Sequence, residues 1–352
     1  MKKYIFSLAV LMVVCVSCKK DPEPELPFIS FSKSLYGTNR VKIMLAGSET
    51  ATIDWGDDTA SATHVLLPFS DSEKNLYHHY YTSDSSHIIK ITGENITHLV
   101  FIEGSNLTNL DVSNNLKLTH LNCSLLKLTS LDISKNTDLL YLNCYYCQLS
   151  SLDVRNNTKL ETLNCEKNQL TSLDVSKNNG LTELNCRRNQ LTSLDVSKNN
   201  GLIELNCNGN QLKSLDVYYN TALERLFCVG NQLTSLDVTN NIVLTDLDCY
   251  ANQLTRLDVS NNKALSLFEY GRNQIANMDM SNNAALTTLR CRSNDLSSDE
   301  LNFLFETLHN NAINYKSIYI CDNPGTEDCN QSIVTNKGWI VYTYSYGNID
   351  YD

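Results

Sequence analysis

The stretch LNCRRNQLTSLDVSKNNG, residues 184–201, returns almost unchanged 21 residues earlier and 21 residues later. Cysteines recur at this spacing, and Tyr270 fills the one gap in their series: Cys123, Cys144, Cys165, Cys186, Cys207, Cys228, Cys249 and Cys291. An aspartate series follows the same spacing: Asp111, Asp132, Asp153, Asp174, Asp195, Asp216, Asp237, Asp258 and Asp279. About nine copies of one unit therefore span residues 96–296, and repetition at such a period predicts a solenoid.

Each unit divides into two halves that share one template. Residues 181–189 read L-x-x-L-x-C-x-x-N, and residues 191–199 read L-x-x-L-x-V-x-x-N. Alternate side chains of an extended segment face opposite ways, so Leu184 and Cys186 should face inward while Asn185 faces outward. The unit is too short for a crossover helix. We therefore expect both halves to be short strands or extended segments, stacked on the next unit about 4.8 Å away.

These templates resemble the leucine-rich-repeat consensus, in the short variant where both halves of a turn carry the motif. The resemblance covers more than half of the chain, and it departs from the usual pattern where cysteine replaces the third leucine of the first half. It implies a mainly β, right-handed solenoid with parallel strands. We expect an Ig-like β-sandwich before the solenoid and an α/β cap after it, because a terminal turn would otherwise expose its core.

Asparagines end both halves of the unit. A turn leaves backbone groups without partners, and an inward amide can hydrogen-bond them on its own turn and on the adjacent one. A second-half series runs in 21-residue steps from Asn115 to Asn283, and Cys147 and Leu126 replace asparagine in two early first halves. The first-half series, which we interpret as a structural ladder, is Asn168, Asn189, Asn210, Asn231, Asn252, Asn273 and Asn294.

The cysteine series is interpreted as a column of small buried hydrophobic residues. Zinc requires four converging ligands, which a one-dimensional stack does not supply, so we predict no metal site. The parallel Cβ vectors of neighbouring turns also disfavour disulfides within the column. Cys321 and Cys329 lie outside it, and a local disulfide between these two residues is an open alternative in an exported protein.

The aspartate series should form an outward column whose carboxylates repel one another. Calcium could bridge them, because carboxylate oxygens are its preferred ligands, yet a flat column offers few oxygens to each ion. We therefore favour hydrogen bonds to flanking residues such as Ser193 and Ser214, with water screening the remaining charge.

The first 18 residues, MKKYIFSLAVLMVVCVSC, predict a secretory signal, because two lysines precede an apolar run too short for a comfortable membrane span. Val16-Ser17-Cys18 resembles the lipobox of bacterial lipoproteins, which implies a signal peptide at 1–17 and acylation of Cys18. Cys15 departs from that pattern, where leucine is usual. Residues 18–27 form a polar, proline-containing tether. We expect an exported protein, anchored by lipid to the outer membrane and exposed at the cell surface.

Residues 28–95 contain strand-like runs separated by polar turns. The combination of IDWGDDT at 53–59, HYY at 79–81 and IKI at 89–91 resembles the signature of PKD-type β-sandwich domains. In that family the W-G-D turn and the H-x-Y pair are structural, which implies that Trp55 belongs to a core. Asp58 stands where the family usually has glycine. The predicted strand runs are 40–47, 51–59, 76–81 and 87–93.

Residues 297–352 are predicted to close the stack. The segment 298–308 has helical spacing with an N-cap serine and early acidic residues. The expected elements are a helix at 298–308, a strand at 317–320, a second helix at 327–336 and a strand at 339–344.

Charge and missing motifs restrict the function. A net charge of −11 disfavours nucleic acid, because phosphates demand basic patches. The sequence lacks the G-x-S-x-G, H-E-x-x-H and G-x-x-x-x-G-K-[ST] motifs. We predict a monomeric, non-enzymatic protein without a cofactor. The alternatives are an accessory module or hydrolase acting on extracellular polymers, and a structural spacer of the envelope.

Outward positions of the first halves vary strongly between turns, whereas those of the second halves scarcely change. Tyrosine and arginine are enriched among the residues that dominate binding energy. We therefore predict that the first halves bind a protein or glycan ligand at the cell surface. In the turn of the opening stretch, Arg188 accompanies the candidates Glu183 and Arg187. The candidate contact residues are Tyr141, Tyr145, Glu183, Arg187, Arg225, Phe227, Tyr250, Glu269 and Arg292.

Overall fold

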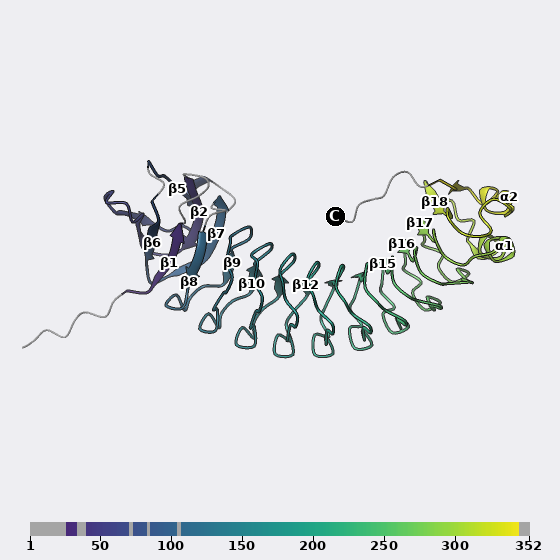
Figure 1. Cartoon of the computed structure of the whole chain (residues 1–352), viewed down its shortest axis with the longest axis horizontal. Coiled ribbons are helices and arrows are strands. Elements are labelled where there is room, and N and C mark those ends of the chain that lie inside the picture. Colours follow the sequence, from purple (N-terminus) through teal and green to yellow (C-terminus); the bar gives the residue numbers. More distant parts are fainter. Residues whose placement is uncertain (1–25, 34–39, 70–72, 83–84, 104–106, 345–352) are drawn as a thin grey trace, which may run out of the picture.

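The computed structural model describes residues 26–33, 40–69, 73–82, 85–103 and 107–344. The predicted signal peptide, Cys18 and most of the tether lie outside the described residues. The turns of the solenoid follow one another along an arc, with the N-terminal strands at one end and the helices at the other (Figure 1). The predicted mainly β solenoid with parallel strands is confirmed.

The N-terminal strands form two sheets around a shared apolar core. Ile29 and Phe31 of one strand face Ile89 and Ile91 of its neighbour, and all four are at most 1% exposed. Alternation of buried and partly exposed side chains places these residues on the inner face. The five-stranded sheet has the order β4-β3-β6-β1-β8, with β1 Phe28–Lys33, β3 Thr50–Asp54, β4 Ala62–Val65, β6 His87–Thr92 and β8 Leu107–Asp111.

The second N-terminal sheet continues into the solenoid. Strand β2 (Arg40–Gly47) pairs antiparallel with β5 (Leu76–Tyr80), which follows the short 3-10 helix Glu73–Asn75. On its other side β2 pairs antiparallel with β7 (Ile96–Glu103). Strand β7 then pairs in parallel with β9 (His120–Asn122), the next strand of the solenoid. The predicted domain boundary at residues 95 and 96 is therefore crossed by one hydrogen-bonded sheet.

Each first half of a repeat contributes one three-residue strand whose middle side chain is buried. These strands pair in parallel without a register shift from one turn to the next. The second halves, such as residues 191–199, are extended segments rather than strands. The strands are β9 His120–Asn122, β10 Tyr141–Asn143, β11 Thr162–Asn164, β12 Glu183–Asn185, β13 Glu204–Asn206, β14 Arg225–Phe227, β15 Asp246–Asp248, β16 Leu267–Glu269 and β17 Thr288–Arg290.

The cysteine column lies in the core between these two layers. Cys186 and its counterparts are fully buried free thiols. Burial raises the pKa of Cys186 to about 12, so this thiol stays neutral. A neutral, fully enclosed thiol packs as a small hydrophobic side chain.

Asparagine amides join each turn to its neighbours. The Nδ2 of Asn189 donates to the carbonyl of Cys165 one turn earlier and to that of Cys186 in its own turn, both at 3.0 Å. Its Oδ1 accepts the backbone N–H of Leu170 at 3.0 Å. In the second-half series Asn199 donates to the carbonyls of Val175 and Asn178, both of which lie one turn earlier. These bonds satisfy buried backbone groups that the turns leave without partners.

The C-terminal segment adds two strands to the same sheet. Helix α1 (Ser298–Thr307) begins with a capping box between Ser297 and Glu300. Strand β18 (Lys316–Tyr319) pairs in parallel with β17 and with β19 (Trp339–Tyr342). The second predicted helix, at 327–336, is shorter: only α2 (Ser332–Thr335) is helical, and turns precede it.

Replacing a ladder asparagine should destabilise the solenoid. In Asn189→Ala, the buried groups that the amide satisfies lose their partners, which costs about 2 kcal/mol or more. We expect the midpoint of urea unfolding to fall. The exposed Asn200→Ala is the matched control and should leave the midpoint unchanged. Equal midpoints for the two variants would contradict the proposed role of the ladder.

Candidate recognition surface

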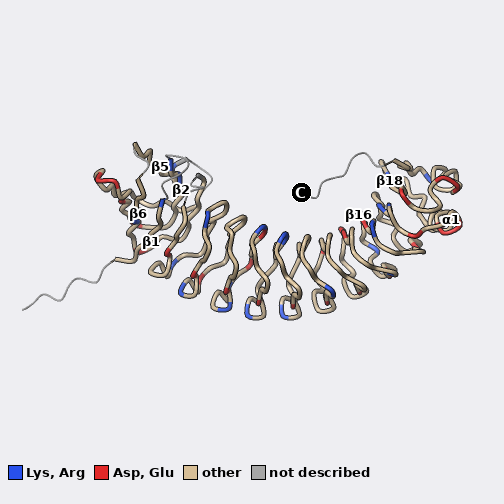
Figure 2. Tube along the Cα trace, viewed as in Figure 1, with Lys and Arg blue, Asp and Glu red and all other residues tan. Residues whose placement is uncertain are grey.

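The solenoid presents two faces of different character. The first-half face consists of the outward side chains of strands β9–β17 and of the residues, such as Tyr145 and Arg187, that follow the ladder cysteines. The second-half face consists of the outward side chains of the extended segments. Because the strands are in register, equivalent residues form straight columns, as Glu204 with Arg225 and Asn206 with Phe227 show. Lysine and arginine recur at the outer turns of the arc (Figure 2).

Ion pairs between neighbouring turns hold the central arginines of the first-half face. The Nε of Arg225 lies 2.7 Å from Oε2 of Glu204. The Nη1 of Arg187 lies 3.4 Å from Oε1 of Glu166. Glu183 is exposed. These partly exposed pairs add little to stability, but they orient the guanidinium groups on a rigid sheet.

Tyr145 makes two contacts to one lysine. Its hydroxyl lies 3.3 Å from Nζ of Lys167, which is also 5.6 Å from the ring centroid. The ring therefore has a fixed cationic neighbour one turn further along.

Aromatic rings stack along the N-terminal end of the first-half face. Phe69 stacks on His98 with centroids 4.6 Å apart, His98 on His120 at 4.1 Å, and His120 on Tyr141 at 5.9 Å. Desolvation, followed by the charge of His120, lowers the pKa of His98 to about 4. Burial likewise lowers the pKa of His120. Both rings are thus neutral at neutral pH. Sequence reasoning found only Tyr141 of these four rings, because Phe69 and His98 come from outside the cysteine series.

Threonine hydroxyls assign the tautomers of the two stacked histidines. Thr97 Oγ1 donates to the carbonyl of Ala46 at 3.2 Å, so it accepts from Nδ1 of His98 at 2.9 Å. Thr119 donates to the carbonyl of Thr97 and accepts from Nδ1 of His120 in the same way. The Nε2 atoms therefore carry the lone pairs.

Three of the candidate contact residues are buried at the C-terminal end of the face. Tyr250, Glu269 and Arg292 are 9%, 0% and 9% exposed. Arg292 covers the ring of Tyr250, with Cζ 4.7 Å from the centroid. The sequence predicted that these side chains offer contacts to a ligand. In the structure they pack against one another and support the surface instead.

The carboxyl group of Glu269 is held in a cage that requires a glycine. Its Oε1 accepts the backbone N–H of Gly271 at 3.2 Å, and its Oε2 lies 3.8 Å from Nε of Arg290. A Cβ at Gly271 would stand 2.7 Å from Oε1 and 2.8 Å from the carbonyl of Arg292. Desolvation, with a smaller contribution from Asp248, raises the pKa of Glu269 to about 8.

The aspartate column of the second-half face hydrogen-bonds its own turns. Oδ1 of Asp195 accepts the backbone N–H of Ser197 at 2.9 Å, and the other aspartates repeat this contact. These bonds lower the pKa of Asp195. The donors are the backbone N–H and, in turns such as that of Thr239, the hydroxyl of the residue two positions on, whereas the sequence predicted serines two positions earlier such as Ser193. Within the described residues, no three His, Cys, Asp or Glu side chains are grouped to hold a metal ion.

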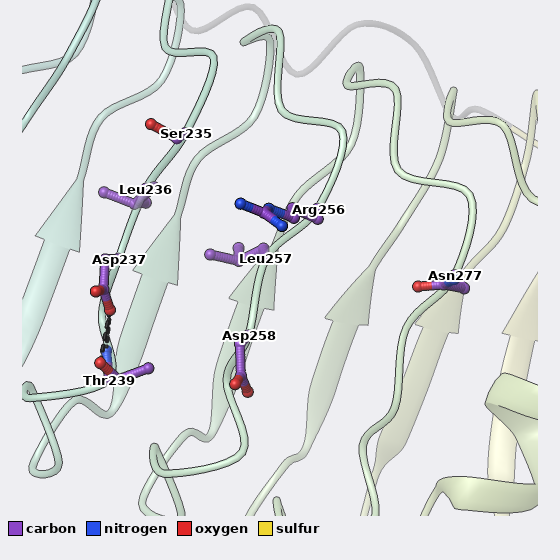
Figure 3. Close-up of a pocket in the computed structure, with 8 residues that line it drawn as sticks. All are labelled: Ser235, Leu236, Asp237, Thr239, Arg256, Leu257, Asp258 and Asn277. Carbon is purple, nitrogen blue, oxygen red and sulfur yellow. Dashed lines mark hydrogen bonds between the residues drawn. The ribbon is translucent and has the colours of Figure 1, made fainter.

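One stretch of the second-half face is hollowed. A groove of about 420 Å³ lies between Ser235, Asp237, Arg256 and Asn277, which come from three neighbouring segments. Figure 3 shows these residues in front of the strands of the sheet. Arg256 and Asn277 replace the serine that earlier turns carry at this position. Sequence reasoning treated this face as constant and missed the groove.

Cys321 and Cys329 are separate, buried thiols, and the disulfide between them stays a prediction. Across the parts of the chain that the structure describes, no helix is long and apolar enough to cross a membrane.

The in-register strands, the asparagine bonds and the leucine core define the class of protein: the chain is a leucine-rich-repeat solenoid. It is similar to the functional domain of InlJ from Listeria monocytogenes, which includes a cysteine ladder, with 36% identity, 67% of this chain covered and a TM-score of 0.59. The chain spans 55% of that domain's length. It also shares its fold with the internalin InlF of Listeria monocytogenes, at 22% identity, with 71% of this chain and 87% of that one covered and a TM-score of 0.52. No family model and no curated protein matches the chain.

The buried carboxyl group of Glu269 should make the stability of the protein depend on pH. Its folded pKa of about 8 exceeds the usual 4.5, so only the unfolded state ionises as the pH rises between these values. Glu269 therefore costs stability progressively from pH 4.5 to pH 8. We expect Glu269→Gln to gain at least about 1 kcal/mol relative to the wild type between pH 5 and pH 8 in urea unfolding. The exposed Glu183→Gln is the control, and an equal pH dependence in wild type and Glu269→Gln would refute this assignment.

Proposed function

We propose that the chain is a non-enzymatic recognition protein of the bacterial cell surface, and that it binds a protein partner through the first-half face. The observation that carries the proposal is the contrast between the two faces. Outward residues of the first halves change from turn to turn, while an identical ladder keeps their backbone positions constant. A rigid frame that bears variable side chains can meet a partner without reordering, which lowers the cost of binding.

The composition of this face fits a protein partner. Arg187, Arg225 and Phe227 lie centrally, between the aromatic stack that ends at Tyr141 and the packed cluster under Tyr250. Arginine and aromatic residues are the types that dominate the energy of protein interfaces. The ion pairs with Glu166 and Glu204 orient the arginines before a partner arrives.

We further propose that the N-terminal sheets are a PKD-like domain that supports the solenoid. The tryptophan of the W-G-D turn stacks on His79 at 5.2 Å and accepts the hydroxyl of Tyr81 at its carbonyl at 2.9 Å. Oδ2 of Asp57 lies 2.6 Å from Nε2 of His79. Asp58 adopts a left-handed backbone with φ of 63°, a conformation that glycine favours and aspartate tolerates. This explains how the turn forms although Asp58 replaces the usual glycine. With this turn packed on His79 and Tyr81, the domain would be a rigid spacer between the membrane and the solenoid.

The anchor and the C-terminal cap complete the proposal. Acylation of Cys18 would tether the chain to the outer membrane through residues 18–27, and the solenoid would act as a monomer. At the other end, helix α1 and strands β18 and β19 would cap the last repeat, where the core of the solenoid ends.

Binding to an array of extracellular proteins and glycans tests the proposal. Residues 26–352 should retain at least one protein. The double variant Arg225→Ala/Phe227→Ala should weaken its binding at least about tenfold, because such residues commonly carry more than 1 kcal/mol each. The matched control is Ser172→Ala/Thr192→Ala on the second-half face, which should bind like the wild type.

Three other outcomes would overturn the proposal. An equal loss of binding in both double variants would show that the protein does not bind through the first-half face. The absence of any retained protein would favour an envelope spacer. Turnover in a screen of extracellular polymers would favour a hydrolase or an accessory module.

A further inference from the structure

The second-half face breaks its own repetition over a few consecutive turns. Where the opening stretch has Ser197 and Lys198, the next turn has Tyr218 and Tyr219. Serine occupies the position before the inner leucine from Ser130 to Ser235, and then Arg256 and Asn277 replace it. Arg155 departs from the pattern at an earlier turn, but the breaks from Tyr218 to Asn277 fall on neighbouring turns.

The same turns carry adjoining grooves. The groove beside Arg256 shares Ser235 and Asp237 with a second groove of about 390 Å³, which reaches both tyrosines. Tyr219 also lines a third groove, of about 550 Å³, that contains Lys198. We name this connected surface, from Lys198 to Asn277, the second-half groove. It runs across the extended segments, as an elongated ligand would require.

Two tyrosines form an exposed aromatic corner in the second-half groove. Each is 54% exposed, and their ring centroids lie 5.1 Å apart with the planes at 79°. The turn beneath them is held by hydrogen bonds from the N–H of Tyr218 to Asp216 and from the Asn220 amide to two carbonyls. Exposed rings on a fixed backbone can cover the apolar face of a ligand with little loss of conformational entropy.

The polar groups around the corner are of both signs. Asp237 accepts the N–H and the hydroxyl of Thr239 through Oδ1, at 2.9 and 2.6 Å, and these bonds lower its pKa. It is therefore an ionised acceptor. Lys198 and Arg256 contribute exposed donors. The carboxylates would repel a polyanion, and the lysine and the arginine would repel a polycation.

We propose that the second-half groove binds a neutral saccharide chain. A sugar ring has an apolar C–H face that packs on an aromatic ring, and an edge of hydroxyls that both donate and accept. Tyr218 and Tyr219 would cover C–H faces, Asp216 and Asp237 would accept from hydroxyls, and Arg256 would donate to ring or hydroxyl oxygens. The site lies on the face opposite to the proposed protein interface, so the two functions are independent.

Affinity electrophoresis through gels that contain yeast mannan, laminarin or dextran tests the proposal, with heparin as an anionic comparison. The test variant, Tyr218→Ser/Tyr219→Lys, gives this turn the residues of the preceding turn, so it should fold. We expect at least one neutral polysaccharide to retard the wild type. The variant should raise the apparent dissociation constant about tenfold or more, because two ring contacts are lost.

A tyrosine pair elsewhere supplies the matched control. Tyr145→Ala/Tyr146→Ala removes two neighbouring rings from another turn, one of them also 54% exposed, and should leave retardation unchanged. Arg225→Ala/Phe227→Ala should do the same, which separates this proposal from the protein interface. Three results would overturn it: no retardation by any neutral polysaccharide, retardation by heparin alone, or equal retardation of the wild type and Tyr218→Ser/Tyr219→Lys.

Discussion

The asparagine amide is the contact on which the solenoid depends. In the first-half series each amide joins a carbonyl of its own turn, a carbonyl of the previous turn and a backbone N–H of the previous second half, whereas in the second-half series it joins two carbonyls of the previous turn. Leucines and cysteines supply the apolar area, but burial is not directional and would tolerate turns that slide past one another. Three directed bonds from one side chain remove that freedom. The strands consequently stay in register, and every outward side chain keeps a fixed neighbour one turn away.

Because the register is fixed, equivalent residues of successive repeats form columns in which neighbouring side chains affect one another's pKa. Two histidines that stand 22 residues apart become a stacked pair with lowered pKa values, because β7 and β9 align them. Asp248 and Glu269 become neighbours in the same way, and the burial of Glu269 raises its pKa. Such couplings cost stability at particular pH values. The ladder can sustain them because each cost is local, whereas the bonds between turns are repeated along the whole rod.

The inward half of this molecule could be read from its sequence, and the reason is repetition. Leu184, Cys186 and Asn189 recur with one spacing, so a single argument about alternation and turns applies to every copy. The outward residues differ from copy to copy, so no single argument predicts the surroundings of each one. Glu269 was expected at the surface, yet Arg290 and Arg292 lie over it, and Gly271 leaves the room that its carboxyl group needs. Phe69, from the segment between β4 and β5, and His98, from β7, lie at the end of the first-half face, and the cysteine repeat does not include either position.

The separation between core and surface would also allow the two faces to bind different ligands, as we propose. A change at Tyr218 or Arg256 leaves the amide bonds of Asn220 and the buried leucines untouched, because outward side chains take no part in the ladder. Either face can therefore acquire a site over a few turns without disturbing the other. The departures on the first-half face extend over most turns, as a broad protein interface requires, while Tyr218, Tyr219 and Arg256 of the second-half face line adjoining grooves. That difference in extent supports our proposals of a large partner for one face and a slender one for the other.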